Sequence, residues 1–247
     1  MLPLLAAQVA PALEAARLHE RTRTAGRPAE AAINLRDEVL AGVSHDLAIW
    51  RAAHYSDVRY KLNLTLEKMS PVLKGTIEIR VKVAGQIVSS APGAEAVAPP
   101  IILDWRKIAG HEKDSTVTNI TLNEIPLFNG DQRADGMAPS PAFKYHESND
   151  HLILPDAIKA GENVIKLDFT SPILTSGSAI TRYIDKEDGS EYIYSLFVPS
   201  DASTAFPVFD QPDLKARFSL SVKAPEDWKV VSNGTPGIRW GELGNII

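Results

Sequence analysis

The chain has 247 residues, of which 44% are hydrophobic, 23% charged and 7% aromatic, a composition typical of a folded globular protein rather than a disordered or fibrous one. Its 26 basic and 31 acidic residues give a net charge of −5, which argues against a general binder of nucleic acid or of anionic membranes. The chain has no cysteine, which excludes disulfides, thiol catalysis and cysteine-ligated metal sites. No apolar run is long enough for a helix to span a bilayer.

The first residues of the chain, 1–13, are apolar, and two interpretations of them stay open. They resemble the later half of a secretory signal, without the basic region that normally precedes the apolar part. The alternative is an alanine-rich helix that runs to about Glu20. A signal remnant would make the protein periplasmic or secreted, and otherwise we expect it in the cytoplasm. A further helix is predicted over 29–40, ended by Gly42.

From Tyr55 onward, apolar and polar residues alternate with a period of two, which is typical of half-buried strands. The two clearest examples are 58–67 and 77–83. Closely spaced strands without long helices between them predict a mainly β fold, an antiparallel multi-stranded sheet domain preceded by a short helical N-terminal extension. Further strands are predicted over Ile101–Asp104, 117–122, His151–Leu154, 164–169, 192–197, Ala216–Lys223 and 229–232.

Two patterns of polar residues suggest chemistry at first sight. His146-Glu147 is followed by His151, but the two histidines are five residues apart, whereas a helical zinc site needs a spacing of four so that both face one ion. We therefore predict no metal site there. Asp210 and Asp213 suggest an acid–base pair, but Asp-Gln-Pro-Asp is more typical of a structural turn in which Pro212 restricts φ.

The segment 192–234 contains a more specific pattern, Phe-Pro-x-Phe-Asp-x-Pro at 206–212 followed by Lys-Ala-x-Phe at 215–218. It resembles the end of the N-terminal β-domain of the aminopeptidase N family, the gluzincin zinc aminopeptidases. Similar patterns occur upstream in the same order as in that family, in segments 73–79, Ile101–Asp104, 152–169 and 182–189. The resemblance implies a saddle-like β-domain in which Phe206, Phe209 and Phe218 lie in the packed interior.

The same resemblance implies site residues. The substrate-pocket loop (the 195–199 loop) would consist of Ser195, Leu196, Phe197, Val198 and Pro199. The structural motif would consist of Phe206, Pro207, Phe209, Asp210, Pro212, Lys215 and Phe218. In the family, two Gln or Glu side chains in this loop bind the amine of the substrate. Leu196 and Val198 stand at those positions and offer no hydrogen-bond acceptor, so this role is not carried over.

The family's Gly-x-Met-Glu-Asn and His-Glu-x-x-His motifs do not occur in these 247 residues. We therefore expect an N-terminal extension at 1–53, the β-domain at 54–234 and a non-matching tail at 235–247. The resemblance implies that this domain walls the substrate pocket of a zinc metalloaminopeptidase that removes N-terminal residues from peptides. The zinc, and the general base that activates water, would belong to a thermolysin-like catalytic domain outside this fragment. The chain alone is predicted to be inactive and to bind no cofactor.

An alternative from a different functional class is a freestanding β-sandwich binding or adhesion module without enzymatic activity. Alternating strands and loops rich in proline and glycine fit such a module equally well. The Phe-Pro-x-Phe-Asp-x-Pro pattern favours the aminopeptidase interpretation, because a generic sandwich has no need of it.

Overall fold

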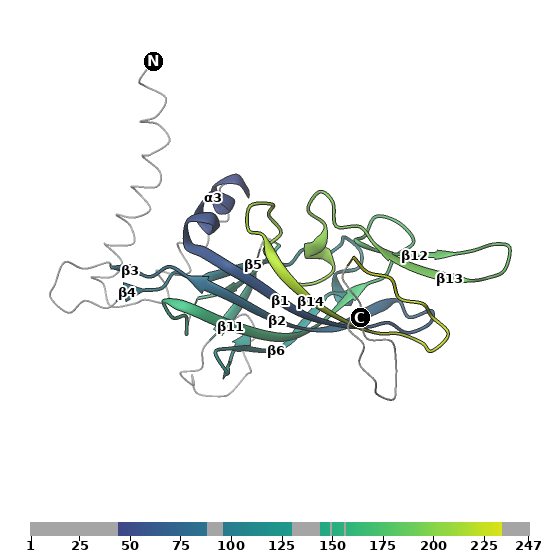
Figure 1. Ribbon diagram of the computed structural model, residues 1–247, viewed down its shortest axis with the longest axis horizontal. Coiled ribbons are helices and arrows are strands. Elements are labelled where there is room, and N and C mark those ends of the chain that lie inside the picture. The colour runs from purple at the N-terminus through teal and green to yellow at the C-terminus, as the bar shows by residue number, and fades with distance from the viewer. Residues whose placement is uncertain (1–43, 88–95, 130–143, 149, 156, 234–247) are drawn as a thin grey trace, which may run out of the picture.

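The computed structural model of the protein describes residues 44–87, 96–129, 144–148, 150–155 and 157–233 (Figure 1). The predictions for 1–13, 29–40 and 235–247 lie outside these residues. The described part is mainly β, which confirms the predicted fold class, and it begins with one short helix, α3 (Ser44–His54). No helix within the described ranges has the length and apolar character needed to cross a membrane.

The strands of the described ranges form two larger sheets and two hairpins. The larger sheet has the order β14-β1-β2-β11-β6-β7, and the second has the order β5-β10-β9-β8. The first contains β1 (Tyr55–Thr65), β2 (Val72–Val83), β6 (Thr116–Leu122), β7 (Ile125–Pro126), β11 (Gly161–Pro172) and β14 (Ala216–Lys223). The second contains β5 (Ile101–Asp104), β8 (Phe128–Asn129), β9 (Lys144–Ser148) and β10 (His151–Leu154). The hairpins are β3 (Gln86–Ile87) with β4 (Ala96–Val97), and β12 (Ile180–Ile184) with β13 (Glu191–Ser195).

Most strand pairs are antiparallel, but two pairs in the described residues are parallel. Strand β14 joins β1 in parallel, with Val58 opposite Ala216 and Thr65 opposite Lys223. Strand β8 likewise runs parallel to β9. The sheets are therefore mixed, because the chain returns from the far end of the molecule and adds β14 to the open edge of β1. Short-range alternation cannot reveal this arrangement.

One apolar core fills the space between the two larger sheets. The side chains of Ile77, Ile79 and Val81 on strand β2 point into this core, while the polar residues between them face outward. From the opposite side, β5 and β10 contribute Leu103 and Leu154. This alternation places the apolar residues of each strand on one face, as the pattern of period two predicts.

Helix α3 covers the other face of the second sheet. Its Leu47 packs on Ile102 and Ile153, which alternate with the core residues of β5 and β10. Asp46 lies in the first turn of the helix and Arg51 in the last turn, where each charge is favourable to the helix dipole. Because Arg51 is also buried, the helix contacts the β-domain through a charged side chain as well as through the apolar side chain of Leu47.

A glycine allows the closest contact inside the larger sheet. Gly75 of β2 pairs with Phe169 of β11, and a Cβ atom at Gly75 would lie 2.7 Å from the Phe169 Cε1 atom. Real Cβ atoms do not approach a ring carbon so closely, so a side chain at position 75 would displace the Phe169 ring.

Two of the sequence predictions are wrong. Phe218 is 56% exposed, whereas Phe206 and Phe209 are buried as predicted. Strand β14 lies at the edge of its sheet, so the Phe218 ring stays largely exposed although it stacks on Tyr60 at a centroid distance of 4.6 Å and contacts Phe206 edge-on at 6.5 Å. The segment 229–232 is not a strand, because it does not pair with another strand; Val231 there is 84% exposed.

Alanine substitutions should separate the interior residues from the edge residue. Phe206→Ala and Phe209→Ala should each lower the free energy of unfolding by about 3–5 kcal/mol, because each leaves a cavity in a closed core. Phe218→Ala should lower it much less, close to the effect of the control Phe128→Ala, whose side chain is 58% exposed. Urea unfolding followed by tryptophan fluorescence measures all four. A loss at Phe218 equal to that at Phe206 would contradict the edge assignment.

Candidate functional site

The Phe-Pro-x-Phe-Asp-x-Pro segment is joined to the end of β5 by backbone hydrogen bonds. The N–H of Asp104 donates to the Val208 carbonyl at 2.7 Å, and the N–H of Val208 donates to the Asp104 carbonyl at 3.1 Å. The result is an isolated antiparallel bridge between residues far apart in sequence. Two of the patterns on which the sequence resemblance rests therefore meet in one place.

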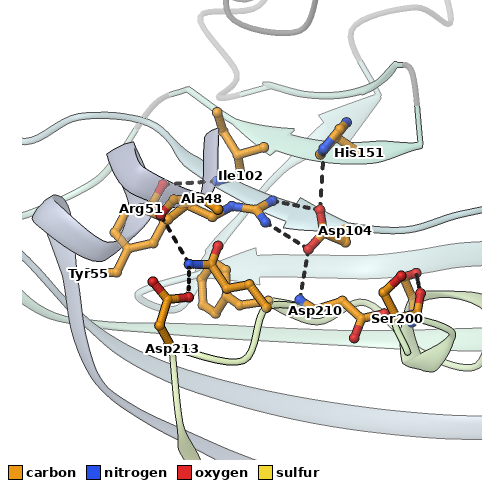
Figure 2. Close-up of polar contacts among 12 residues, drawn as sticks. Ala48, Arg51, Tyr55, Ile102, Asp104, His151, Ser200, Asp210 and Asp213 are labelled. Carbon is orange, nitrogen blue, oxygen red and sulfur yellow. Dashed lines mark hydrogen bonds and ion pairs between the residues drawn. The ribbon is translucent and has the colours of Figure 1, made fainter. Parts of the chain in front are cut away.

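The Asp104 carboxylate is the centre of this contact (Figure 2). Arg51 of α3 donates to both of its oxygens, at 2.7 and 2.8 Å. The backbone N–H of Asp210 donates to Oδ2 at 2.8 Å, and His151 Nε2 lies 3.3 Å from Oδ1. We call Arg51, Asp104, His151, Val208 and Asp210 the Asp104 anchor. It joins a helix, two strands and a loop through a single acceptor group.

Aromatic residues complete the anchor on its inner side. The Tyr60 hydroxyl accepts a hydrogen bond from the N–H of Phe209 at 2.9 Å, and Arg51 lies over the Phe209 ring at 5.7 Å from its centroid. The Tyr55 hydroxyl donates to the Pro100 carbonyl at 2.6 Å and accepts from the N–H of Ile102 at 3.2 Å. Burial raises the pKa of both tyrosines, so they remain neutral and act as structural hydrogen-bonding groups.

Asp210 and Asp213 do not act as a catalytic pair in this arrangement. Asp210 Oδ2 accepts a hydrogen bond from the backbone N–H of Ser203 at 2.9 Å, and burial raises the pKa of its carboxyl group. Asp213 accepts a hydrogen bond from the Gln211 side chain at 2.9 Å, and that amide also donates to the Ala48 carbonyl of α3 at 3.1 Å. Both aspartates therefore order the turn, which agrees with the structural interpretation.

The histidine pattern likewise forms no zinc-binding helix. His146 lies on β9 and His151 on the adjacent strand β10, where His146 is opposite Ile153 and His151 is opposite Ser148. Within the described ranges, no three His, Asp or Glu side chains are grouped so as to hold a metal ion.

The 195–199 loop begins at the last residue of β13 and carries exposed apolar side chains. Leu196, Phe197 and Val198 are 58%, 37% and 73% exposed. The base of the loop is held by the Leu196 N–H, which donates to the Ala179 carbonyl at 2.8 Å. The Phe197 ring contacts buried Phe206 edge-on, at a centroid distance of 5.6 Å. The loop is thus fixed to the core at its base while its apolar side chains face solvent.

The family model described as the Peptidase M1 N-terminal domain matches residues 104–242, which is more than half of the chain. The chain belongs to the Peptidase M1 N-terminal domain family. The matched segment of this M1 domain begins at Asp104 itself and includes the 195–199 loop and the whole Phe-Pro-x-Phe-Asp-x-Pro segment.

Several curated relatives are similar to parts of the M1 domain. Aminopeptidase N of Streptomyces lividans is 35% identical over 113 residues, which cover 46% of this chain and 12% of the relative. Probable aminopeptidase 1 of Sulfurisphaera tokodaii is 30% identical over 138 residues, which cover 54% of this chain and 16% of the relative. The chain therefore spans only a small fraction of the length of these relatives.

A solved structure shares the fold of the M1 domain. Yeast LTA4 hydrolase in complex with Bestatin aligns with a TM-score of 0.52 and 16% identity, over 78% of this chain and 26% of that one. At this identity the likeness concerns the fold alone.

Sequence reasoning did not identify the members of the anchor outside the motif. In the sequence, Asp104 stands out only as part of a strand, Arg51 only as a basic residue before the first strand, and His151 only as part of the rejected zinc pattern and as the start of a strand. The aspartate at the end of the otherwise apolar Ile-Ile-Leu-Asp strand is the one clue to the anchor, because a carboxylate at the end of a buried strand needs hydrogen-bond donors from other segments.

Removal of the Asp104 charge should strongly destabilise the M1 domain. Asp104→Asn leaves the guanidinium of Arg51, whose side chain is 4% exposed, without its anionic partner, so the free energy of unfolding should fall by about 3–5 kcal/mol. Asp227→Asn is the matched control, because Asp227 forms an exposed ion pair with Lys68 and its loss should change little. Equal effects of the two substitutions in urea unfolding would contradict the anchor.

The anchor should also produce a defined pH dependence. Burial alone would raise the pKa of Asp104, but the hydrogen bonds from His151 and Arg51 outweigh it and hold the pKa at about 2, against 3.8 in the unfolded chain. The folded state thus favours the ionised form, and this stabilisation is present above pH 4 and lost as the pH falls toward 2.

The stability difference between the natural chain and Asp104→Asn should therefore shrink by about 2 kcal/mol between pH 5 and pH 2. Asp57 has a similarly low pKa, but it is present in both chains and its contribution cancels. A difference that is independent of pH would show that Asp104 is not held as a carboxylate.

Proposed function

We propose that this chain is the N-terminal β-domain of a zinc metalloaminopeptidase and that its 195–199 loop forms one wall of the substrate pocket. In this proposal residues 54–234 make up the domain, and a thermolysin-like catalytic domain supplies the reacting groups. The parent enzyme removes N-terminal residues from peptides. The observation that carries the proposal is an exposed apolar loop fixed to the core of a chain that belongs to the M1 N-terminal family.

The chemistry of the loop limits what it contributes. Leu196, Phe197 and Val198 present only apolar side chains, so they shape the pocket and exclude water but cannot bind an ammonium group. The nearest carboxylate along the chain, Asp201, forms an ion pair with Arg106. In this proposal any group that recognises the amine of the substrate lies on the catalytic domain.

The zinc ion of the proposed enzyme does not fit the described residues of this chain. They contain no cluster of three potential ligands, and the histidines on β9 and β10 follow strand geometry rather than the spacing of a zinc-binding helix. The domain's part in the reaction is therefore to hold and enclose the substrate.

The purified chain should bind no stoichiometric zinc and should hydrolyse no aminoacyl amide, because the residues that the structure describes contain no group of three potential zinc ligands. Metal analysis after dialysis and a chromogenic leucine-amide assay measure the two properties. About one zinc retained per chain would contradict the proposal.

A further prediction concerns the catalytic domain that the proposal requires. An apolar surface that normally lies against another domain binds a hydrophobic dye when it is exposed. The chain should bind such a dye, and a catalytic domain from an M1 aminopeptidase, added as a separate polypeptide, should suppress the signal. The double variant Leu196→Ser, Val198→Ser should bind less dye than the control Phe128→Ser. A chain that is monomeric, dye-silent and indifferent to the added domain would favour the freestanding binding module.

A further inference from the structure

The β12–β13 hairpin carries three tyrosines on one face. Tyr183 is opposite Tyr192, and Thr181 is opposite Tyr194, in the antiparallel register. Because side chains alternate across a strand, Tyr192 and Tyr194 share a face, and Tyr183 lies on it as the partner of Tyr192. Their exposed fractions are 52%, 52% and 54%, and the rings of Tyr183 and Tyr192 lie 6.2 Å apart. We call Tyr183, Tyr192 and Tyr194 the tyrosine face.

The opposite face of the hairpin is fixed to the body of the domain. The Arg182 Nε atom lies 2.6 Å from Glu191 Oε1, and the two side chains are only 10% and 8% exposed. Arg182 also donates to the Ser70 carbonyl, and the N–H of Met69 donates to the Glu191 carboxylate at 3.1 and 3.2 Å. The hairpin is thus held in one orientation, and its tyrosines face solvent without being able to turn inward.

The tyrosine face continues directly into the 195–199 loop. Leu196 lies two residues beyond Tyr194, and its N–H extends the hairpin pairing to the Ala179 carbonyl. Figure 1 shows the hairpin at one end of the molecule, with its turn extending past the other elements. One apolar strip therefore leads from the proposed pocket wall outward along the hairpin.

The charges along this strip are unbalanced. Asp185, Glu187 and Asp188 at the turn face a single cation, Lys186, and no Lys or Arg occurs between residues 187 and 214. A hydrogen bond from the Ser190 N–H lowers the pKa of Asp188, so its carboxylate is ionised at neutral pH. The strip is thus apolar along its length and negative at its far end.

We propose that the tyrosine face binds an extended peptide that carries apolar side chains followed by basic ones. This inference rests on the proposed function, in which the peptide begins at the 195–199 loop. From Leu196 back to Tyr192 the strand covers about 13 Å, which matches about four residues of an extended peptide. Apolar side chains at those positions pack on the tyrosine rings, and Lys or Arg beyond them meets the carboxylates of the turn.

The charge pattern favours a peptide over a second copy of this chain. A symmetric dimer would use the same strip on both molecules, and this strip brings no basic residue between 187 and 214 to meet the acidic turn of the partner. A basic peptide provides the complementary charge.

The test uses the whole chain and a short fluorescein-labelled peptide in which about four leucine residues are followed by lysine residues. Fluorescence anisotropy should show saturable binding that weakens about tenfold or more in Tyr192→Ser, Tyr194→Ser, because aromatic anchors dominate such contacts. The control Phe128→Ser, equally exposed on β8, should bind as the natural chain does. Circular dichroism and thermal unfolding establish that all variants are folded.

Two matched peptides test separately the basic and the apolar side chains of the peptide. Replacement of lysine by glutamate, or of leucine by serine, should each reduce binding about tenfold or more. Unchanged binding by the tyrosine variant would overturn the proposal. A concentration-dependent dimer that the tyrosine variant abolishes would also overturn the proposal, because the tyrosine face would then bind a second copy of this chain. If the peptide fails to bind while an added catalytic domain still suppresses the dye signal, only this inference falls and the proposed function stands.

Discussion

The partly buried carboxylate of Asp104 connects a helix, two strands and a loop of this domain. Asp104 needs donors because it is held away from water, and its donors come from the N-terminal helix, from β10 and from the loop after η2 (Ala202–Thr204). The charge is satisfied only when all of these segments are in place. A buried ion pair adds little net stability over an apolar contact, but an incomplete one is costly. The Asp104 anchor therefore acts mainly by penalising every arrangement in which the helix, the sheets and the motif loop are out of position.

The sequence predicted most of what depends on local pattern. Alternation over ten or so residues is enough to locate β1, β2 and β11, because the two faces of a strand differ in polarity. It could not decide the burial of Phe218, which depends on whether another strand covers the edge. The Arg51–Asp104 pair, two residues 53 positions apart, was also beyond reach, since a pairwise contact between distant segments leaves no trace in either segment alone. Strand β12, which the sequence did not predict, lacks a clear alternation because Arg182 shares a face with Ile180 and Ile184 and donates to the Ser70 carbonyl.

The Phe-Pro-x-Phe-Asp-x-Pro motif and the loop before it have two different tasks. Phe206, Phe209 and Asp210 are committed to the core and to the anchor, so they are constrained by packing. The side chains of Leu196 and Val198 face solvent and can change without disturbing the fold. A rigid base with a variable rim is a common way for a scaffold to present a binding surface. The fold of the M1 domain therefore does not depend on which side chains stand at positions 196 and 198.

The parallel pairing of β1 with β14 has a consequence for how the polypeptide is made. Strand β1 leaves the ribosome before the other described strands, yet its outer neighbour is the last strand of the described chain. Until β14 is synthesised, β1 presents an unpaired row of backbone groups and the apolar side of Tyr60 to its surroundings, a state prone to wrong pairing. The β1 edge of the sheet is covered only after residues 216–223 have been synthesised. A nascent chain that stalls before residue 216 would thus leave the outer edge of β1 unpaired and open to pairing with another chain.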